Sequence, residues 1–356
     1  MAHRRQRDRG GRHRCGCSAR RARTGRIHRS LRRLRDDPGE PLGSRRFRPH
    51  PGRGRGWSLE PSQGLIVLTD FLQLTVAGLS QGSVYALLAV GLIAVYTVRH
   101  VINIAQGEFA MLAGLGSAWL VAAGMPLLLG VLVAILTVTL VAIAMERLII
   151  ARVKKLTPLT SIILTLGVST LLQAIMLLAW GPEAKGVPLF PGTNVLIGGV
   201  SIRSQEFWMI GALVIVGGGI VLFYEKSRWG KALRACAEQP VAARIVGISP
   251  VTASILAFAI AGFVGGVAGV VASPIYLSLW SGGVLLGLKG FVAAVLGGFV
   301  SFRAAIVGAL LLGMIEAYVA GYVSSGLRDG AAFLILILVL VVRPQGLVLK
   351  PTAVRV

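Results

Sequence analysis

The residues most able to act on a small solute form a short polar cluster at the start of an apolar stretch. Asn103, Gln106 and Glu108 occur in "YTVRHVINIAQGEFAML", residues 96–112. A carboxylate or carboxamide in hydrocarbon is costly unless it finds a partner. We therefore expect these side chains to face the protein interior or a water-filled pathway. Capping of a broken helix, or a hydrogen bond to a neighbouring helix, explains the same groups, and the two roles can coexist.

A second polar group lies in the preceding apolar stretch, "GLSQGSVYALLAVGL" at residues 78–92. Gln81, Ser83 and Tyr85 belong to it, and we include them in the same predicted pathway. Ser and Tyr side chains often bond locally within a helix, which is the alternative explanation. Because the apolar stretches hold no Ser/His pair, HExxH or paired aspartates, we predict no catalytic residues, no metal site and no cofactor.

The composition predicts the elements that must hold these groups. The 356-residue chain is 54% hydrophobic and 14% charged, with a mean hydropathy of +0.75. Soluble domains are about 45–50% apolar and about 25% charged. We therefore predict an all-α polytopic membrane protein, a bundle of about eight to nine transmembrane helices.

The predicted spans follow one another closely, because about 20 apolar residues cross a bilayer. They are residues 71–97, 105–123, 126–146, 158–180, 207–224, 251–273, 285–300, 304–322 and 329–342. Segments 285–300 and 329–342 are short for a full crossing and could be tilted or re-entrant. Glycines recur inside the spans, as in "AGFVGGVAGVVAS" at 261–273, and this favours closely packed helices.

Basic loops predict the orientation of the chain in the membrane. Residues 147–155, residues 226–244 and the C-terminal tail carry Lys and Arg, so we expect all three to be cytoplasmic. Two predicted spans separate the first pair and four separate the second loop from the tail, which is consistent. The same count places the residues before Asp70 outside.

Residues 1–64 form a separate region that holds 19 of the 37 Lys and Arg residues, all of them Arg. The region has no apolar period, so it offers neither a core to fold around nor the h-region of a signal peptide. We expect it to be disordered or an artefact of an upstream start assignment, since export of so basic a segment conflicts with the orientation. A nucleic-acid-binding arm is the alternative, but we predict no nucleic-acid partner. Residues 65–356 form the predicted membrane domain.

The stretch "GKALRACAEQPVAARIVGI", residues 230–248, is polar and basic between two apolar runs. Pro240 suits the first turn of a helix, and Gly247 suits a left-handed helix end. The pattern predicts two short helices that project from the cytoplasmic face, within a segment spanning 226–250. We interpret this segment as a docking element for a cytosolic protein; a helix lying on the membrane surface is the alternative.

Four motifs, in order, resemble the branched-chain amino acid permease family of bacterial ABC importers, of the LivH kind. They are "GLSQGSVYALLAVGL" and "VINIAQGEFAMLAG" within residues 78–114, "GLKGFVAAVLGG" at 287–298, and "VRPQGL" at 342–347. The set Ala237-Glu238, Ala242-Ala243 and Gly247-Ile248 resembles the cytoplasmic coupling segment of bacterial ABC importer permeases. The resemblance covers roughly residues 70–350. Two residues depart from it: the family usually has His in place of Gln106, and an acidic residue is common at the position of Gln239.

The resemblance implies a permease subunit in the bacterial cytoplasmic membrane that imports branched-chain amino acids, or amides or urea, by alternating access. The implied partners are a second homologous permease, two cytosolic ATP-binding subunits, an external solute-binding protein and the lipid bilayer. No G-x-x-x-x-G-K-[ST] occurs, so ATP hydrolysis falls to a partner. The docking element would then contact the ATP-binding subunit. We assign that contact to Arg234, Ala237, Glu238, Ala243 and Gly247.

A channel or secondary transporter for small polar solutes is the alternative function. It would need its own coupling-ion site, and Glu108 and Glu316 are the only acids that we place within or near the spans. An intramembrane enzyme is a third class, which the absence of catalytic motifs disfavours.

Overall fold

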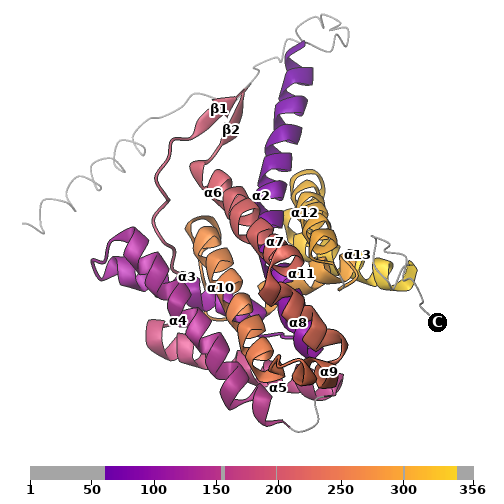
Figure 1. The fold of residues 1–356 in the computed structure, drawn as a ribbon. Coiled ribbons are helices and arrows are strands. Elements are labelled where there is room, and N and C mark those ends of the chain that lie inside the picture. Colours follow the sequence, from indigo (N-terminus) through magenta and orange to yellow (C-terminus); the bar gives the residue numbers. More distant parts are fainter. Residues whose placement is uncertain (1–60, 154–156, 198, 300, 343–356) are drawn as a thin grey trace, which may run out of the picture. The chain divides into compact units, whose positions relative to one another are not determined.

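The computed structural model describes residues 61–153, 157–197, 199–299 and 301–342, and in these ranges the chain is a helical bundle (Figure 1). Seven of the helical segments described are long and apolar enough to cross a membrane: Leu68–Arg99, Leu127–Arg152, Pro158–Trp180, Ser204–Lys226, Pro250–Tyr276, Phe302–Val323 and Ser325–Val342. The predicted fold class is confirmed. The predicted spans 105–123 and 285–300 are shorter helices, of 17 and 14 residues. Most of the Arg-rich region, residues 1–60, lies outside the described residues.

The elements are as follows: α2 Pro61–Arg99, α3 Gln106–Ala122, α4 Leu127–Leu148, η1 Ile150–Arg152, α5 Pro158–Trp180, β1 Val195–Ile197, β2 Val200–Ile202, α6 Ser204–Ala212, η2 Leu213–Gly217, α7 Gly218–Lys226, α8 Arg228–Glu238, α9 Pro240–Ile245, α10 Pro250–Tyr276, α11 Gly283–Leu296, α12 Phe302–Tyr318, η3 Val319–Val323, η4 Ser325–Leu327 and α13 Arg328–Val342.

Two of the long helices begin with the same local signal, a hydroxyl cap followed by proline. The Thr157 side chain accepts a hydrogen bond from the backbone N–H of Thr160, and Pro158 takes the first helical position. Ser249 and Pro250 do the same for α10. A hydroxyl cap satisfies an N–H that the helix itself leaves free, and proline has no N–H to lose.

Helices α2 and α10 form the centre of the bundle. The membrane-spanning windows of these helices are 83% and 78% buried, whereas the other spans are between 11% and 44% buried. Helix α2 packs against α10 and α12, and α10 packs against α3 and α4. The approach of α10 to α3 is so close that a Cβ built on Gly269 would overlap the carbonyl oxygen of Ala110. The predicted use of glycine for close packing is therefore seen at this crossing.

The helices are interrupted at two places inside the bundle. The backbone N–H and C=O groups freed there form hydrogen bonds with side chains or with the backbone of other segments. Between α2 and α3, the Thr165 hydroxyl donates to the carbonyl of Ile102 and accepts from the N–H of Ile104. Between α10 and α11, Ser278 exchanges backbone hydrogen bonds of 2.7 and 3.0 Å with Lys185. Non-helical backbone at membrane depth requires such partners.

An antiparallel hairpin, β1–β2, is the one sheet in the described residues, and the sequence analysis did not predict it. It lies beside the N-terminal part of α2, at the end of the bundle opposite α8 and α9 (Figure 1). Gly199, with φ of +88°, lies in the turn that joins the strands. The Gly-Gly pair between two apolar runs is a hairpin signal that the membrane-span reading overlooked.

Candidate functional site

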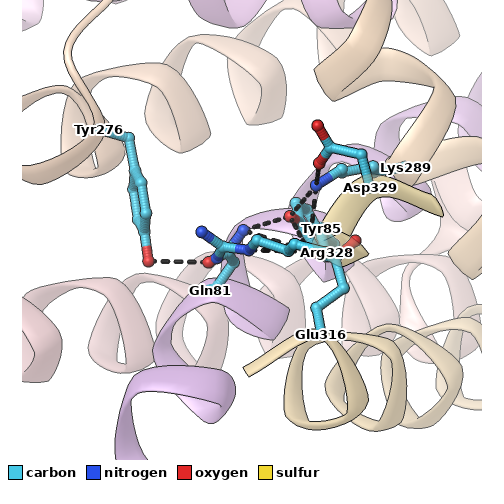
Figure 2. Close-up of polar contacts among 7 residues, drawn as sticks. All are labelled: Gln81, Tyr85, Tyr276, Lys289, Glu316, Arg328 and Asp329. Carbon is cyan, nitrogen blue, oxygen red and sulfur yellow. Dashed lines mark hydrogen bonds and ion pairs between the residues drawn. The ribbon is translucent and has the colours of Figure 1, made fainter. Parts of the chain in front are cut away.

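Seven polar side chains from five helices converge inside the bundle (Figure 2). They are Gln81 and Tyr85 on α2, Tyr276 at the end of α10, Lys289 on α11, Glu316 on α12, and Arg328 and Asp329 at the start of α13. We call this set the polar cluster.

Lys289 has a full set of partners in the polar cluster. Its Nζ lies 3.1 Å from Glu316 Oε2, 2.6 Å from Asp329 Oδ1 and 3.2 Å from Tyr85 Oη. The side chains of Lys289 and Glu316 are only 6% and 0% exposed. An ammonium group has three donors, so these three contacts use all of them.

Glu316 is the acceptor at the centre of the polar cluster. Its Oε2 accepts from the Tyr85 hydroxyl at 2.8 Å, in addition to the Lys289 ion pair, and lies 3.5 Å from Nε of Arg328. The cluster holds two cations and two carboxylates, so its formal charges balance. Buried charges persist only when they are paired in this way, because desolvation alone costs several kcal/mol per ion.

Gln81 joins Tyr276 to the rest of the polar cluster. The Tyr276 hydroxyl donates to Gln81 Oε1 at 2.9 Å, and Gln81 Nε2 donates to the Tyr85 hydroxyl. The guanidinium carbon of Arg328 lies 6.0 Å from the centroid of the Tyr276 ring. The three side chains Gln81, Tyr276 and Arg328 therefore lie together at one side of the cluster, as Figure 2 shows.

Two cavities meet at these three side chains. The inner cavity has a volume of about 290 Å³ and is also lined by Tyr85 and Lys289. Its remaining wall is mainly apolar and includes Val84, Met111, Ala272, Leu279, Leu285 and Leu286. The outer cavity has a volume of about 230 Å³, shares Gln81, Tyr276 and Arg328, and adds Arg203 and Glu206 from the start of α6.

The other residues of the predicted pathway lie elsewhere. Ser83 donates to the carbonyl of Leu79, one turn earlier in its own helix, so the local alternative holds for this residue. Gln106 donates to the carbonyl of Ala261 on α10 at 3.0 Å. Asn103 lines a separate, mainly apolar cavity of about 140 Å³, and its amide group has no hydrogen-bond partner in the described ranges.

Glu108 belongs to a third buried site. Its Oε1 accepts from Ser169 at 2.9 Å and from Gln173 at 2.7 Å, both on α5. Its Oε2 is buried without a partner among the residues described. The structure thus brings Gln81 and Tyr85 into the polar cluster and keeps the other four predicted residues apart from it.

The sequence analysis missed several of the charged residues inside the bundle. Lys289 and Arg328 were not proposed, although a Lys inside the apolar run "GLKGFV" is itself a signal of an intramembrane site. Glu146 is a further buried acid, paired at 3.1 Å with Arg99 and hydrogen-bonded to Ser254. Among the described residues, no group of three His, Cys, Asp or Glu side chains could hold a metal ion.

The segment 226–250 contains the two short helices that the sequence predicts, α8 and α9. Ser227 caps α8 by accepting from the N–H of Trp229, and Pro240 opens α9. Gly247 has φ of +84° and ends α9 in the left-handed region. Gln239 makes no side-chain cap, which agrees with its departure from an acidic residue there.

The five residues assigned to partner contact divide by exposure. Arg234, Glu238 and Gly247 are exposed, and Ala237 is half-buried. Ala243 is only 2% exposed and packs in the core, so its side chain does not offer the predicted partner contact. Arg234 also donates to the carbonyl of Glu225 on α7. Three apolar side chains on or directly after α9, Val241, Ile245 and Val246, are 74%, 85% and 77% exposed. The segment therefore presents both charged and apolar groups to its surroundings.

Comparison with known proteins identifies the family. Residues 74–342 match the family model of the branched-chain amino acid transport system / permease component. The chain is 33% identical over 301 residues to the high-affinity branched-chain amino acid transport system permease protein BraD of Pseudomonas aeruginosa, covering 80% of this chain and 98% of the relative. It is 32% identical over 309 residues to the corresponding permease protein LivH of Salmonella typhimurium, with the same coverage.

A solved structure, PsaBC from Streptococcus pneumoniae in complex with Fab, superposes with a TM-score of 0.47 at 15% identity, over 80% of this chain and 97% of that chain. The family match and the curated relatives, together with the seven segments able to span a membrane, show that this chain is a multi-pass membrane protein belonging to the branched-chain amino acid transport permease family.

Proposed function

We propose that the chain is the transmembrane subunit of an ATP-driven importer in the bacterial cytoplasmic membrane. It moves branched-chain amino acids, or related small polar solutes such as amides or urea, inward by alternating access. The observation that carries this proposal is the inner cavity of about 290 Å³, which has polar groups at one wall and aliphatic side chains at the other. Its volume is near the lower end of the roughly 300–1,000 Å³ of ligand pockets, and its lining suits a small amphipathic solute.

The proposed partners are a second homologous permease, two cytosolic ATP-binding subunits and an external solute-binding protein. The segment 226–250 supports the assignment of the ATP-binding subunit. Its exposed Val241, Ile245 and Val246 form an apolar surface, and exposure of such a surface to water is unfavourable. Exposed apolar surfaces of this kind mark contact sites for other proteins. When the ATP-binding subunits close on nucleotide, α8 and α9 would move with them as a rigid body. This motion would displace α7 and α10, which precede and follow α8 and α9 in the chain.

The residues predicted for the translocation pathway enter this proposal in different roles. Gln81 and Tyr85 line the inner cavity and contact the solute directly. Asn103 faces its own cavity at the break before α3, and we place it on the path toward the cytoplasm. Gln106 and Glu108 hold neighbouring helices together through their hydrogen bonds, whereas Ser83 bonds only within its own helix.

The test is uptake of labelled leucine by proteoliposomes that contain this chain, its sister permease and the ATP-binding subunits, with the binding protein outside. We expect uptake to require ATP, and to stop when the catalytic glutamate of the ATPase is replaced. Uptake that continues without ATP and follows an ion gradient would instead support a secondary transporter, which the buried acids Glu108, Glu146 and Glu316 could serve.

A further inference from the structure

A guanidinium group with unused donors lies where the two cavities meet. Arg328 lines both the inner and the outer cavity, and its side chain is 31% exposed. Its Nε is near Glu316, and its guanidinium carbon lies over the Tyr276 ring. In the described part of the chain, the two terminal nitrogens of Arg328 have no hydrogen-bond partner. They leave a planar pair of donors of the kind that binds a carboxylate in a bidentate fashion.

The other cation of the polar cluster is not available in this way. Lys289 spends its three donors on Glu316, Asp329 and Tyr85, and it is almost fully buried. An anionic group that entered the inner cavity would therefore find its free donors at Arg328. The hydroxyl of Tyr85 is likewise committed to Glu316.

The charges around the cavities also suit one class of solute. Glu206, in the outer cavity, is the only acid among the described residues that line either cavity. Arg203 also lines the outer cavity, and its charge offsets that of Glu206. A carboxylate on Arg328 and an ammonium group facing Glu206 would add one charge of each sign, so a zwitterion leaves this balance unchanged. The aliphatic wall of the inner cavity, with Val84, Leu285 and Leu286, would then take an apolar side chain.

We infer that Arg328 binds the carboxylate of a transported α-amino acid, while Glu206 attracts its ammonium group and the inner cavity receives its side chain. The inference rests on the proposed import function and narrows its substrate from small polar solutes to amino acids. Urea and amides lack the anionic group that a guanidinium fork selects, so they bind this site poorly.

The site can be tested without the binding protein, which would add its own selectivity. In the assembled complex, with Cys15 and Cys17 replaced by Ser, Ala272→Cys places a thiol in the wall of the inner cavity. The rate at which a small water-soluble maleimide labels this thiol is measured with increasing L-leucine, 4-methylpentanoate, L-leucinamide or urea. The chain without Ala272→Cys gives the background from buried Cys236. We expect L-leucine and 4-methylpentanoate to slow labelling, and L-leucinamide and urea to have little effect.

Three variants separate binding from folding. Arg328→Gln removes a charge-assisted pair of hydrogen bonds to the carboxylate. The concentration of L-leucine that halves the labelling rate should therefore rise at least about tenfold. Arg328→Lys keeps the charge without the fork and should give an intermediate value; Arg303→Gln, an arginine remote from both cavities, should match the parent. Glu206→Gln should remove the advantage of L-leucine over 4-methylpentanoate.

Three outcomes would each overturn the inference. L-leucinamide could protect as well as L-leucine, or L-leucine could fail to protect the parent. The third outcome is unchanged protection by L-leucine in folded Arg328→Gln and Arg328→Lys. ATP-dependent uptake is measured on the same preparations. If the parent shows ATP-dependent uptake but none of these protection effects, the proposed function is supported and the proposed binding site is rejected. Protection without ATP-dependent uptake leaves the site standing and removes the proposed function.

Discussion

Lys289 and Glu316 form an ion pair of 3.1 Å between α11 and α12, and both side chains are almost completely removed from solvent. Loss of one partner unbalances the polar cluster and leaves the remaining buried charge only one counter-ion, Asp329 for Lys289 or Arg328 for Glu316. Removal of one member of a buried ion pair costs about 3–5 kcal/mol. We predict that Lys289→Met or Glu316→Met alone strongly lowers the thermal stability of the detergent-purified protein.

The double variant Lys289→Met/Glu316→Met should lose less stability than the sum of the two single variants, because Arg328 and Asp329 remain to balance each other. Lys231→Met, which removes an exposed lysine of α8, is the control and should change little. The measurement is the melting midpoint of the monodisperse fraction. Additive losses in the double variant would show that Lys289 and Glu316 do not stabilise each other.

The crossing of α3 and α10 depends on Gly269. A Cβ at this position would overlap the backbone of Ala110, so the helices must separate or shift. We predict that Gly269→Ala destabilises the protein by about 1–3 kcal/mol, the usual cost of overpacking. Gly219→Ala on α7 is the matched control, since a Cβ there meets nothing within 4 Å. Equal stability of both variants, measured by thermal unfolding, would mean that the crossing is looser than the structure shows.

The thiol of Cys236 reports on the packing of α8. Only 2% of this residue is exposed, and burial raises the pKa of its thiol, so less thiolate is present at neutral pH. In a chain with Cys15 and Cys17 replaced by Ser, we predict that maleimide labels Cys236 slowly. The labelling rate should rise at a more alkaline pH than the pH at which labelling of an exposed thiol rises. The control is Ala235→Cys with Cys236→Ala, which places the thiol on the exposed face of the same helix. Equal labelling rates would indicate that α8 detaches from the bundle.

The elements that the sequence predicted correctly depend on local signals. Pro240 and Gly247 have backbone preferences that hold whatever surrounds them, so the ends of α9 could be located from a few residues. The long apolar spans were similarly visible from composition. The hairpin at 195–202 was missed because its two strands are short and its apolar residues lie between two spans.

The polar cluster could not be assembled from the sequence, because it joins residues as far apart as Gln81 and Asp329. Its charges were visible individually, but their pairing depends on how α11, α12 and α13 pack. Gln106 shows the converse limit. Its position beside other polar residues indicated a pathway, yet its side chain bonds the backbone of α10 at Ala261. A polar residue in a span indicates that a partner exists without revealing which one.

The last prediction concerns the contact between α9 and the ATP-binding subunit. Ile245 is 85% exposed and makes no core contact, so its replacement should not weaken the fold of the permease. If α9 docks in a cleft of the ATPase, that side chain becomes buried in the complex and contributes to binding. We predict that Ile245→Ser leaves the melting midpoint unchanged and lowers recovery of the ATPase with the purified permease. Leu178→Ser, at the equally exposed end of α5, is the control for loss of an apolar surface residue and should retain the ATPase.

Two further changes in the same segment act in different ways. Gly247→Val meets no steric obstacle, but it forces a Cβ-branched residue to φ of +84°, which costs about 1–2 kcal/mol and alters the end of α9. Glu238→Lys reverses an exposed charge at the junction of the two helices without touching the core. Both should insert and pair with the sister permease, yet lower ATPase recovery and substrate-stimulated ATP hydrolysis at matched permease levels. If Ile245→Ser, Gly247→Val and Glu238→Lys all keep normal ATPase recovery and normal uptake, then α9 is a passive surface loop and the ATPase must contact the permease elsewhere.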